Sequence, residues 1–387
     1  MMRTQIFVSL GACVLLTCGC GSGSSQNDVR QGMAAFNAKN YTEAIAHLSR
    51  ATQRITDSAD LYYQLGAAHL EKGELDPAAE AFQAALELVP AHGGALAGLG
   101  QVAFHKKEFS KAQAFFEQAL GGTSTGDVAR ASMLNGLGLT LAAQERYDLA
   151  RLHLLRAQQA SRTYAPSLYN LGSLYLDKFN LREEALDLFE MYLSVAGKQD
   201  DHYAKAENQI NRLRLNLERT QADELDSLKR DPAAAATLLH EGINAQSAKQ
   251  YAKAAKAYRD ALAADPIAFN AALGLAMTHQ KQGQRAEAME AFKRAASINP
   301  SHQDSHLQAA ELAFQLKRYE EAEKILDRAI ARRPYNPASA ELMARIRYAQ
   351  ARLPEARLYG EFYLSVSQAN DKTRGAYEKW VQSLPVK

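Results

Sequence analysis

A pattern of small and large apolar residues recurs every 34 residues in the second half of the chain, and each copy is closed by a proline. Alanine, a large apolar residue and alanine stand 12, 8 and 5 residues before each proline. The three copies are Ala254, Tyr258, Ala261 and Pro266; Ala288, Phe292, Ala295 and Pro300; and Ala322, Leu326, Ala329 and Pro334. Residues at this spacing share one face of a helix, and proline ends the helix because it lacks an N–H and restrains the residue before it. The pattern therefore predicts a series of equivalent helices.

The same register extends back through the N-terminal half and predicts about nine units, each made of two helices. The units begin at Ser25, Ala59, Gly93, Ala131, Ala165, Ala235, Phe269, Gln303 and Pro337. The eighth position of a unit is small, for example Gly66 in the second unit and Ala276 in the seventh. Small residues let the two helices of a unit approach closely, and a larger side chain there is expected to overpack the contact.

Local signals place some helix boundaries more closely. Asp76–Pro77 and Asp231–Pro232 each offer a carboxylate for the N-cap followed by proline at the first helical position. The fifth unit carries one extra residue in the turn at residues 178–180. We therefore expect helices to start at both Asp–Pro pairs.

Two amphipathic segments interrupt or end the series. Residues 201–228 place Tyr203, Ala206, Ile210, Leu213 and Leu217 on one face of a long helix whose other face is polar, as expected of a helix that caps a stack. Residues 371–384 are similar. The segments 190–195 and 361–366, EMYLSV and EFYLSV, precede these two helices. We infer two blocks of repeats with a hinge at residues 229–232.

The A-x3-F-x2-A-x4-P pattern at a period of 34 resembles the tetratricopeptide repeat (TPR). The resemblance implies an all-α helical solenoid whose concave groove, lined by positions 2, 5, 9, 12 and 13 of each first helix, binds a protein or peptide. The candidate groove residues are Tyr63, Gln101, Phe104, Asn135, Tyr169, Met277, Phe314, Arg345 and Tyr348, and the same positions include Phe36, His105, Asp177, Asn270, Lys281 and Glu311. The alternative is that several of these rings pack against the neighbouring unit.

Lys111 and Arg151 are expected on the outer face. The lysine and asparagine pair with which family members clamp a chaperone carboxylate is absent from the corresponding positions.

The N-terminus has the pattern of an export signal. Arg3 precedes an apolar run at residues 6–16, which is too short to span a bilayer. The following Thr17-Cys18-Gly19-Cys20 and the Gly/Ser-rich segment resemble a bacterial lipoprotein signal, which implies cleavage before Cys20, lipidation of Cys20 and attachment to the outer membrane facing the periplasm. The alternatives are lipidation of Cys18 or Cys13, an uncleaved signal anchor, or an ordinary cleaved leader. The expected division is a signal peptide (1–19), a flexible tether (20–24), a first TPR block (25–199), a capping or linking helix (200–230), a second TPR block (231–370) and a C-terminal capping helix (371–387).

Composition and motifs give no support for catalysis. The net charge of +2 gives no reason to expect nucleic acid, and no cysteine follows Cys20, which excludes thiolate chemistry in the repeats. Residues 98–103 match G-x-G-x-x-A, but they fall inside a predicted helix rather than after a strand. His302 and His306 are four residues apart without a third ligand at a matching spacing. We expect no enzyme activity, no cofactor and no metal.

These features together predict a membrane-anchored TPR lipoprotein that acts as a periplasmic protein–protein interaction scaffold in assembly of the cell envelope. One alternative is an assembly lipoprotein of a type IV pilus or secretin, because such lipoproteins have the same build. Another, from a different functional class, is a docking subunit of an enzyme system for polysaccharide export.

Overall fold

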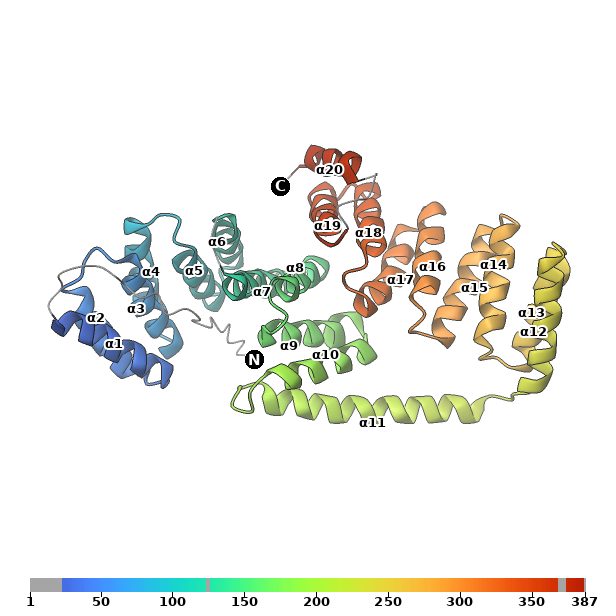
Figure 1. Ribbon diagram of the computed structural model, residues 1–387, viewed down its shortest axis with the longest axis horizontal. Helices are drawn as coiled ribbons and strands as arrows, with labels where there is room; N and C mark the ends of the chain where they lie inside the picture. The colour runs from blue at the N-terminus through green and yellow to red at the C-terminus, as the bar shows by residue number, and fades with distance from the viewer. Residues whose placement is uncertain (1–22, 123–125, 368–373, 386–387) are drawn as a thin grey trace. The chain divides into compact units, whose positions relative to one another are not determined.

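The computed structural model describes residues 23–122, 126–367 and 374–385, and Cys13, Cys18 and Cys20 lie outside this range. The described chain is all-α (Figure 1). The helices up to the first predicted capping helix are α1 (Gly23–Asn37), α2 (Tyr41–Thr52), α3 (Ala59–Lys72), α4 (Leu75–Leu88), α5 (Gly93–His105), α6 (Phe109–Gly121), α7 (Asp127–Ala143), α8 (Tyr147–Ala160), α9 (Ala165–Leu174), the π-helix η1 (Tyr175–Phe179) and α10 (Arg182–Val195). The remaining helices are α11 (Tyr203–Ser227), α12 (Pro232–Ser247), α13 (Tyr251–Ala264), α14 (Phe269–Lys281), α15 (Arg285–Ile298), α16 (Gln303–Gln315), α17 (Tyr319–Arg332), α18 (Pro337–Ala349), α19 (Leu353–Val366) and α20 (Arg374–Ser383).

The helices are arranged in consecutive pairs, and most first helices also contact the first helix of the next pair, for example α3 with α5 and α12 with α14. This arrangement confirms the predicted TPR solenoid. The chain divides into two compact units: unit 1 comprises residues 1–178 and 187–209, and unit 2 comprises residues 179–186 and 210–387. The division runs through α10 and α11.

The predicted small–large–small pattern forms the core in both units. Ala78 and Phe82 are buried on α4 of unit 1, and Ala288 and Phe292 are buried at the equivalent positions on α15 of unit 2. The ring of Phe82 lies against Gly98 of the next repeat, where an added β-carbon would be only 2.4 Å from its Cζ atom. The large residue of a second helix thus packs between two first helices, which explains why the small positions recur.

Each pair of helices is joined by a turn containing one residue in the left-handed region. Glycine fills this position at Gly73 (φ 89°) and Gly283 (φ 73°). The other turns use residues with a side chain, including Lys107 (φ 62°) and Lys317 (φ 60°). Before Asn180 (φ 53°), the π-helix η1 accommodates the extra residue of the fifth unit.

The two predicted N-caps differ in outcome. The Asp231 side chain accepts a hydrogen bond from the Ala234 N–H at 3.0 Å, as expected. The prediction for Asp76 is wrong, because α4 begins at Leu75 and Glu74 occupies the cap position. The carboxylate of Glu74 makes no cap bond; it contacts His69 at 2.6 Å and Lys72 at 2.8 Å.

Both predicted capping helices form. On α11, Ala206, Ile210 and Leu213 are buried, and on α20 Val381 is buried. At the other end of the chain α1 begins at Gly23, inside the segment expected as tether. The outer-face prediction holds for Lys111, which is exposed, and is wrong for Arg151, which is fully buried and lies 3.3 Å from Asp148.

Candidate functional site

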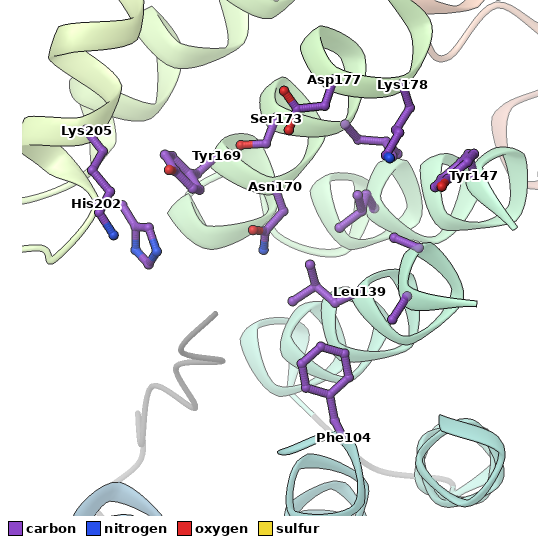
Figure 2. Close-up of a pocket in the computed structure, with 14 residues that line it drawn as sticks. Phe104, Leu139, Tyr147, Tyr169, Asn170, Ser173, Asp177, Lys178, His202 and Lys205 are labelled. Atoms are coloured by element: carbon purple, nitrogen blue, oxygen red, sulfur yellow. The ribbon is translucent and has the colours of Figure 1, made fainter. Parts of the chain in front are cut away.

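A cavity of about 550 Å³ opens within unit 1 on the face formed by its first helices (Figure 2). Its walls come from α5, α7, α8, α9, η1 and the start of α11. The lining residues are Phe104, Leu139, Ala142, Ala143, Tyr147, Leu154, Tyr169, Asn170, Ser173, Leu174, Asp177, Lys178, His202 and Lys205. Three of the predicted groove residues, Phe104, Tyr169 and Asp177, therefore line one cavity.

Aromatic rings stack along one wall of this cavity. The ring centroid of Tyr169 lies 4.5 Å from that of His202, 5.4 Å from that of Tyr192 and 5.7 Å from that of Phe189. Tilted pairs at these distances contribute about 0.5–1.5 kcal/mol each beyond their buried area. Tyr169 is half-buried and is held in place by its neighbours, so one of its edges faces the cavity in a fixed orientation.

Asp200 holds the segment that brings His202 to the cavity. The Tyr192 hydroxyl and the backbone N–H of His202 both donate to Oδ1 of Asp200, the latter at 2.9 Å. Burial lowers the pKa of His202, while the Asp200 carboxylate, 3.6 Å from Nδ1, partly opposes this effect. At neutral pH the imidazole is therefore mainly uncharged, and it can offer one donor and one acceptor to a bound group.

The remaining polar groups give the cavity mixed character. Lys178 lies with Nζ 4.9 Å from the ring centroid of Tyr147. Ser173 and Asp177 follow Asn170 along α9 and η1, and the three side chains share a wall in Figure 2. The cavity thus combines an apolar floor with hydroxyl, amide and carboxylate groups and two lysines, and it can hold an apolar side chain while hydrogen-bonding a peptide backbone.

Asn135 lies behind this wall. It is fully buried, and its Oδ1 accepts a hydrogen bond from Nδ2 of Asn170 at 2.9 Å. This contact joins α7 to α9 and orients the Asn170 amide that lines the cavity. Asn135 thus acts on the cavity through Asn170 and does not line it.

The other predicted residues of unit 1 lie at a separate place. Tyr63 and Gln101 line a cavity of about 10 Å³ together with Phe36, which leaves room for about one water molecule. Gln101 is buried, and the Tyr63 ring is packed 6.0 Å from the ring of Phe82 and 5.3 Å from that of His92. Tyr63 therefore packs between neighbouring repeats, as the alternative interpretation of the groove rings predicted.

The predicted residues of unit 2 fall into two groups. Met277 is exposed and lines a cavity of about 490 Å³ together with Asn270. Further along the unit, the guanidinium of Arg345 lies 4.7 Å from the ring centroid of Phe314 and pairs with both carboxylate oxygens of Glu311 at 3.2 Å. Tyr348 is 50% exposed and contacts Trp380 of the C-terminal capping helix, with ring centroids 5.7 Å apart.

Sequence reasoning missed His202, Lys205 and Tyr147. His202 and Lys205 come from the start of a capping helix, and Tyr147 begins a second helix, so none of them occupies a groove position of the repeat. The sequence pointed to Lys205 only indirectly, because a capping helix was expected to cover the end of the stack.

Two motifs singled out in the sequence have structural roles. His302 caps α16 by accepting from the Ser305 N–H at 3.3 Å, and Nε2 of His306 donates to the Pro300 carbonyl at 3.2 Å. Residues 98–103 lie within α5. In the described part of the chain, no three His, Cys, Asp or Glu side chains cluster as a metal site, and no helix is long and apolar enough to cross a membrane.

Stacked helix pairs with side chains gathered along their first helices define a helical-repeat interaction protein. Profiles of the tetratricopeptide repeat family match residues 63–128, 239–302 and 279–346. The chain is therefore a tetratricopeptide repeat protein, as its sequence pattern predicted, and this fold supports a protein or peptide partner.

Several solved structures are similar. A thermophilic TPR protein from Thermus thermophilus is 21% identical, with a TM-score of 0.43 over 48% of this chain and 98% of that chain. MamA from Desulfovibrio magneticus RS-1 is 19% identical, with a TM-score of 0.37 over 47% of this chain and 100% of that chain. The type IV pilus biogenesis factor PilW is 16% identical, with a TM-score of 0.41 over 64% of this chain and 96% of that chain. No curated protein sequence matches this chain.

Proposed function

We propose that this protein is a membrane-anchored interaction scaffold of the cell envelope, tethered through Cys20, whose unit 1 cavity binds a peptide segment of a partner protein. The cavity between Phe104 and Tyr169 is the observation that supports the peptide site. At about 550 Å³ it is large enough for a bulky apolar side chain and part of the adjoining backbone. The repeats supply a fixed frame, and the cavity offers apolar, hydroxyl and amide groups, so binding is the chemistry that the site favours.

The peptide is expected to insert an apolar or aromatic side chain toward Leu139 and Leu174. Its backbone then lies within reach of Asn170, Ser173 and His202, which offer uncharged hydrogen-bonding groups. Anchors of this kind carry most of the free energy of binding, and truncating one costs about 2 kcal/mol or more.

The peptide site can be tested in two steps. A photo-crosslinking amino acid in place of Phe104 should capture the partner in intact envelopes, whereas the same amino acid in place of the exposed Lys111 should not. Ser173→Arg should then weaken binding of the purified partner at least about tenfold, because the long side chain fills the cavity without removing a packed ring. Ser110→Arg introduces the same side chain on the exposed surface of α6 and is the matched control.

The site is wrong if crosslinks form only from Lys111, or if Ser173→Arg and Ser110→Arg bind the partner equally. Circular dichroism of both variants must show unchanged helicity and melting temperature. Measured binding then reports on the cavity alone.

The anchor is tested separately. Cys20→Ser should abolish incorporation of labelled fatty acid and release the chain from the membrane fraction, while Cys18→Ser and Cys13→Ser should change neither. Retention of label by Cys20→Ser, with loss in either of the other variants, would move the anchor to that cysteine. Retention in the membrane by all three unlabelled variants would indicate an uncleaved signal anchor.

A further inference from the structure

Unit 2 carries an apolar surface that the proposed function does not use. The two adjacent first helices α12 and α14 each place two apolar side chains one turn apart, Leu239 and Ile243 on α12 and Leu273 and Met277 on α14. Ile243 is 47% exposed and Met277 is 42% exposed. These four residues, with Gln246, Ser247, Tyr258, Asn270 and Gly274, line a cavity of about 490 Å³, which we call the unit 2 trough.

The floor of the unit 2 trough is fixed by hydrogen bonds. Tyr258 reaches up from α13 between Gly242 and Gly274, and its hydroxyl donates to Oε1 of Gln246 at 2.7 Å. Thr278 donates to the same oxygen at 3.4 Å. Because these side chains are already held, a ligand would meet a preorganised surface and would lose little further conformational entropy on binding.

Charge is distributed unevenly around the unit 2 trough. None of its nine lining residues is charged. Burying a charged side chain of a ligand against them would leave that charge without a counter-ion, which disfavours a charged ligand face here. Positive charge follows the trough at the C-terminal ends of the two helices, where Lys281 ends α14 and Lys249 follows α12, both of them exposed. At the opposite end of α12, Arg230 is paired with Asp265 at 2.8 Å.

We propose that the unit 2 trough binds an amphipathic α-helix of a partner protein, with an uncharged apolar face and carboxylates at the end that meets Lys249 and Lys281. Apolar pairs spaced one turn apart on two neighbouring helices form a channel that accepts side chains at i, i+3, i+4 and i+7 of a third helix. The lysines at one end complement an acidic helix end and so set its direction. This second site has its own chemistry and is independent of the peptide site in unit 1.

The test uses full-length protein carrying Cys20→Ser and a fluorescein-labelled synthetic helix about 18 residues long, long enough to cover the trough. The helix consists of alanine and glutamine with leucines at i, i+4, i+7 and i+11, and with three glutamates at one end, made in both orders. Fluorescence anisotropy measures binding. Ile243→Glu and Met277→Glu should each weaken binding at least about tenfold. Thr237→Glu places the same charge on an exposed position of α12 outside the trough and should leave binding unchanged.

A second comparison isolates the charged end. A helix with lysines in place of the glutamates should bind about fivefold more weakly, and this preference should disappear in Lys249→Gln/Lys281→Gln but persist in Lys256→Gln. Lys256 is exposed on α13. The preference should also decrease with added salt, because exposed charges are screened.

Three results would overturn the proposal. One is equal binding of the leucine helix and a helix with serine in place of leucine. Another is unchanged binding by Ile243→Glu and Met277→Glu. The third is a concentration-dependent dimer, seen by light scattering without peptide and lost in Ile243→Glu, because the occupant would then be a second copy of this chain.

Discussion

The unit 1 cavity and the unit 2 trough are both formed largely by first helices of tetratricopeptide repeats, yet their chemistry differs. The cavity has two lysines, a carboxylate, an imidazole and a capping-helix wall, whereas the trough is lined without charge and is open along two helices. The second helices nevertheless pack in the same way in both units, because Phe82 in unit 1 and Tyr258 in unit 2 each lie against glycines of two first helices. The repeat pattern therefore specifies the frame, while the groove positions vary and determine which ligand binds.

The two units can be monitored separately. Trp380 is the only tryptophan of the sequence and belongs to unit 2. Its fluorescence follows the unfolding of that unit, whereas circular dichroism follows both. Each prediction below states which of the two signals should change.

The largest effect is expected at a buried ion cluster of unit 2. Arg347 is fully buried, its guanidinium nitrogens lie 2.7 and 2.6 Å from the carboxylate oxygens of Glu323, and Glu355 lies 3.5 Å from Nε. Arg347→Met removes the cation that these two carboxylates share, and we expect it to lower the free energy of unfolding by about 3 kcal/mol. The loss should appear in urea titrations followed by Trp380.

The matched variant is Arg151→Met in unit 1, which removes the other fully buried arginine. It should shift the circular dichroism transition and leave the Trp380 transition unmoved. A shift of Trp380 fluorescence in Arg151→Met would mean that the two units unfold as one.

Acid is expected to destabilise both units through one buried histidine in each. Burial lowers the pKa of His153 in unit 1 to about 3 and that of His306 in unit 2 to about 4. Below about pH 6.5 these histidines bind protons in the unfolded chain but not in the folded chain. The free energy of unfolding therefore falls as the pH decreases. The slope is at most about 1.4 kcal/mol per pH unit for each histidine. The effect of His306 should end near pH 4, and that of His153 near pH 3.

Substitution by glutamine removes the titrating group. His306→Gln keeps a donor for the Pro300 carbonyl and should flatten the pH dependence of the Trp380 transition between about pH 6.5 and pH 4. His153→Gln should flatten only the remaining circular dichroism signal. An unchanged slope in both variants would show that other groups cause the acid sensitivity.

A smaller effect is expected where second-helix rings meet glycines. A β-carbon at Gly98 of unit 1 would lie 2.4 Å from Cζ of Phe82, and one at Gly274 of unit 2 would lie 2.6 Å from Cζ of Tyr258. Gly98→Ala and Gly274→Ala should each cost about 1–3 kcal/mol, because the ring must move in a packed core. Only Gly274→Ala should move the Trp380 transition. Gly375→Ala, where a β-carbon meets nothing within 4 Å, is the control.

The fold was predictable from the sequence because its determinants are local and periodic. The spacing of Ala254, Tyr258 and Ala261 reports which face of a helix is buried, and the same spacing recurs in each unit. The site was less predictable. The repeat positions predict that Phe104 and Tyr169 line the groove. His202 lies at the start of a capping helix, and the periodicity of the sequence does not predict where that helix packs.

Charged residues were the least predictable part. Arg151 lies at a position read as outer surface, and Arg347 lies in a polar stretch, yet both are fully buried. The carboxylate that pairs with Arg347 comes from a neighbouring helix, Glu323 on α17, and such a contact is set by the packing of separate segments, which a single-sequence pattern does not encode. Arg151 pairs with Asp148 on its own helix α8, and the sequence pattern did not predict that this side of α8 is buried.

The smallest effect concerns the left-handed turn residues, which are equivalent in the two units. Lys317 (φ 60°) in unit 2 and Lys107 (φ 62°) in unit 1 adopt a conformation that costs a residue with a β-carbon about 1–2 kcal/mol. Glycine avoids this cost but loses about 0.5–1 kcal/mol through the greater entropy of the unfolded chain. Lys317→Gly should therefore raise the free energy of unfolding by about 0.5 kcal/mol, seen through Trp380, and Lys107→Gly should do the same in the circular dichroism signal alone. The reverse exchange, Gly283→Ala (φ 73°), should lower it by a similar amount. If Lys317→Gly destabilises unit 2 while Gly283→Ala stabilises it, backbone strain is not the controlling factor, and the turn side chains contribute through contacts of their own.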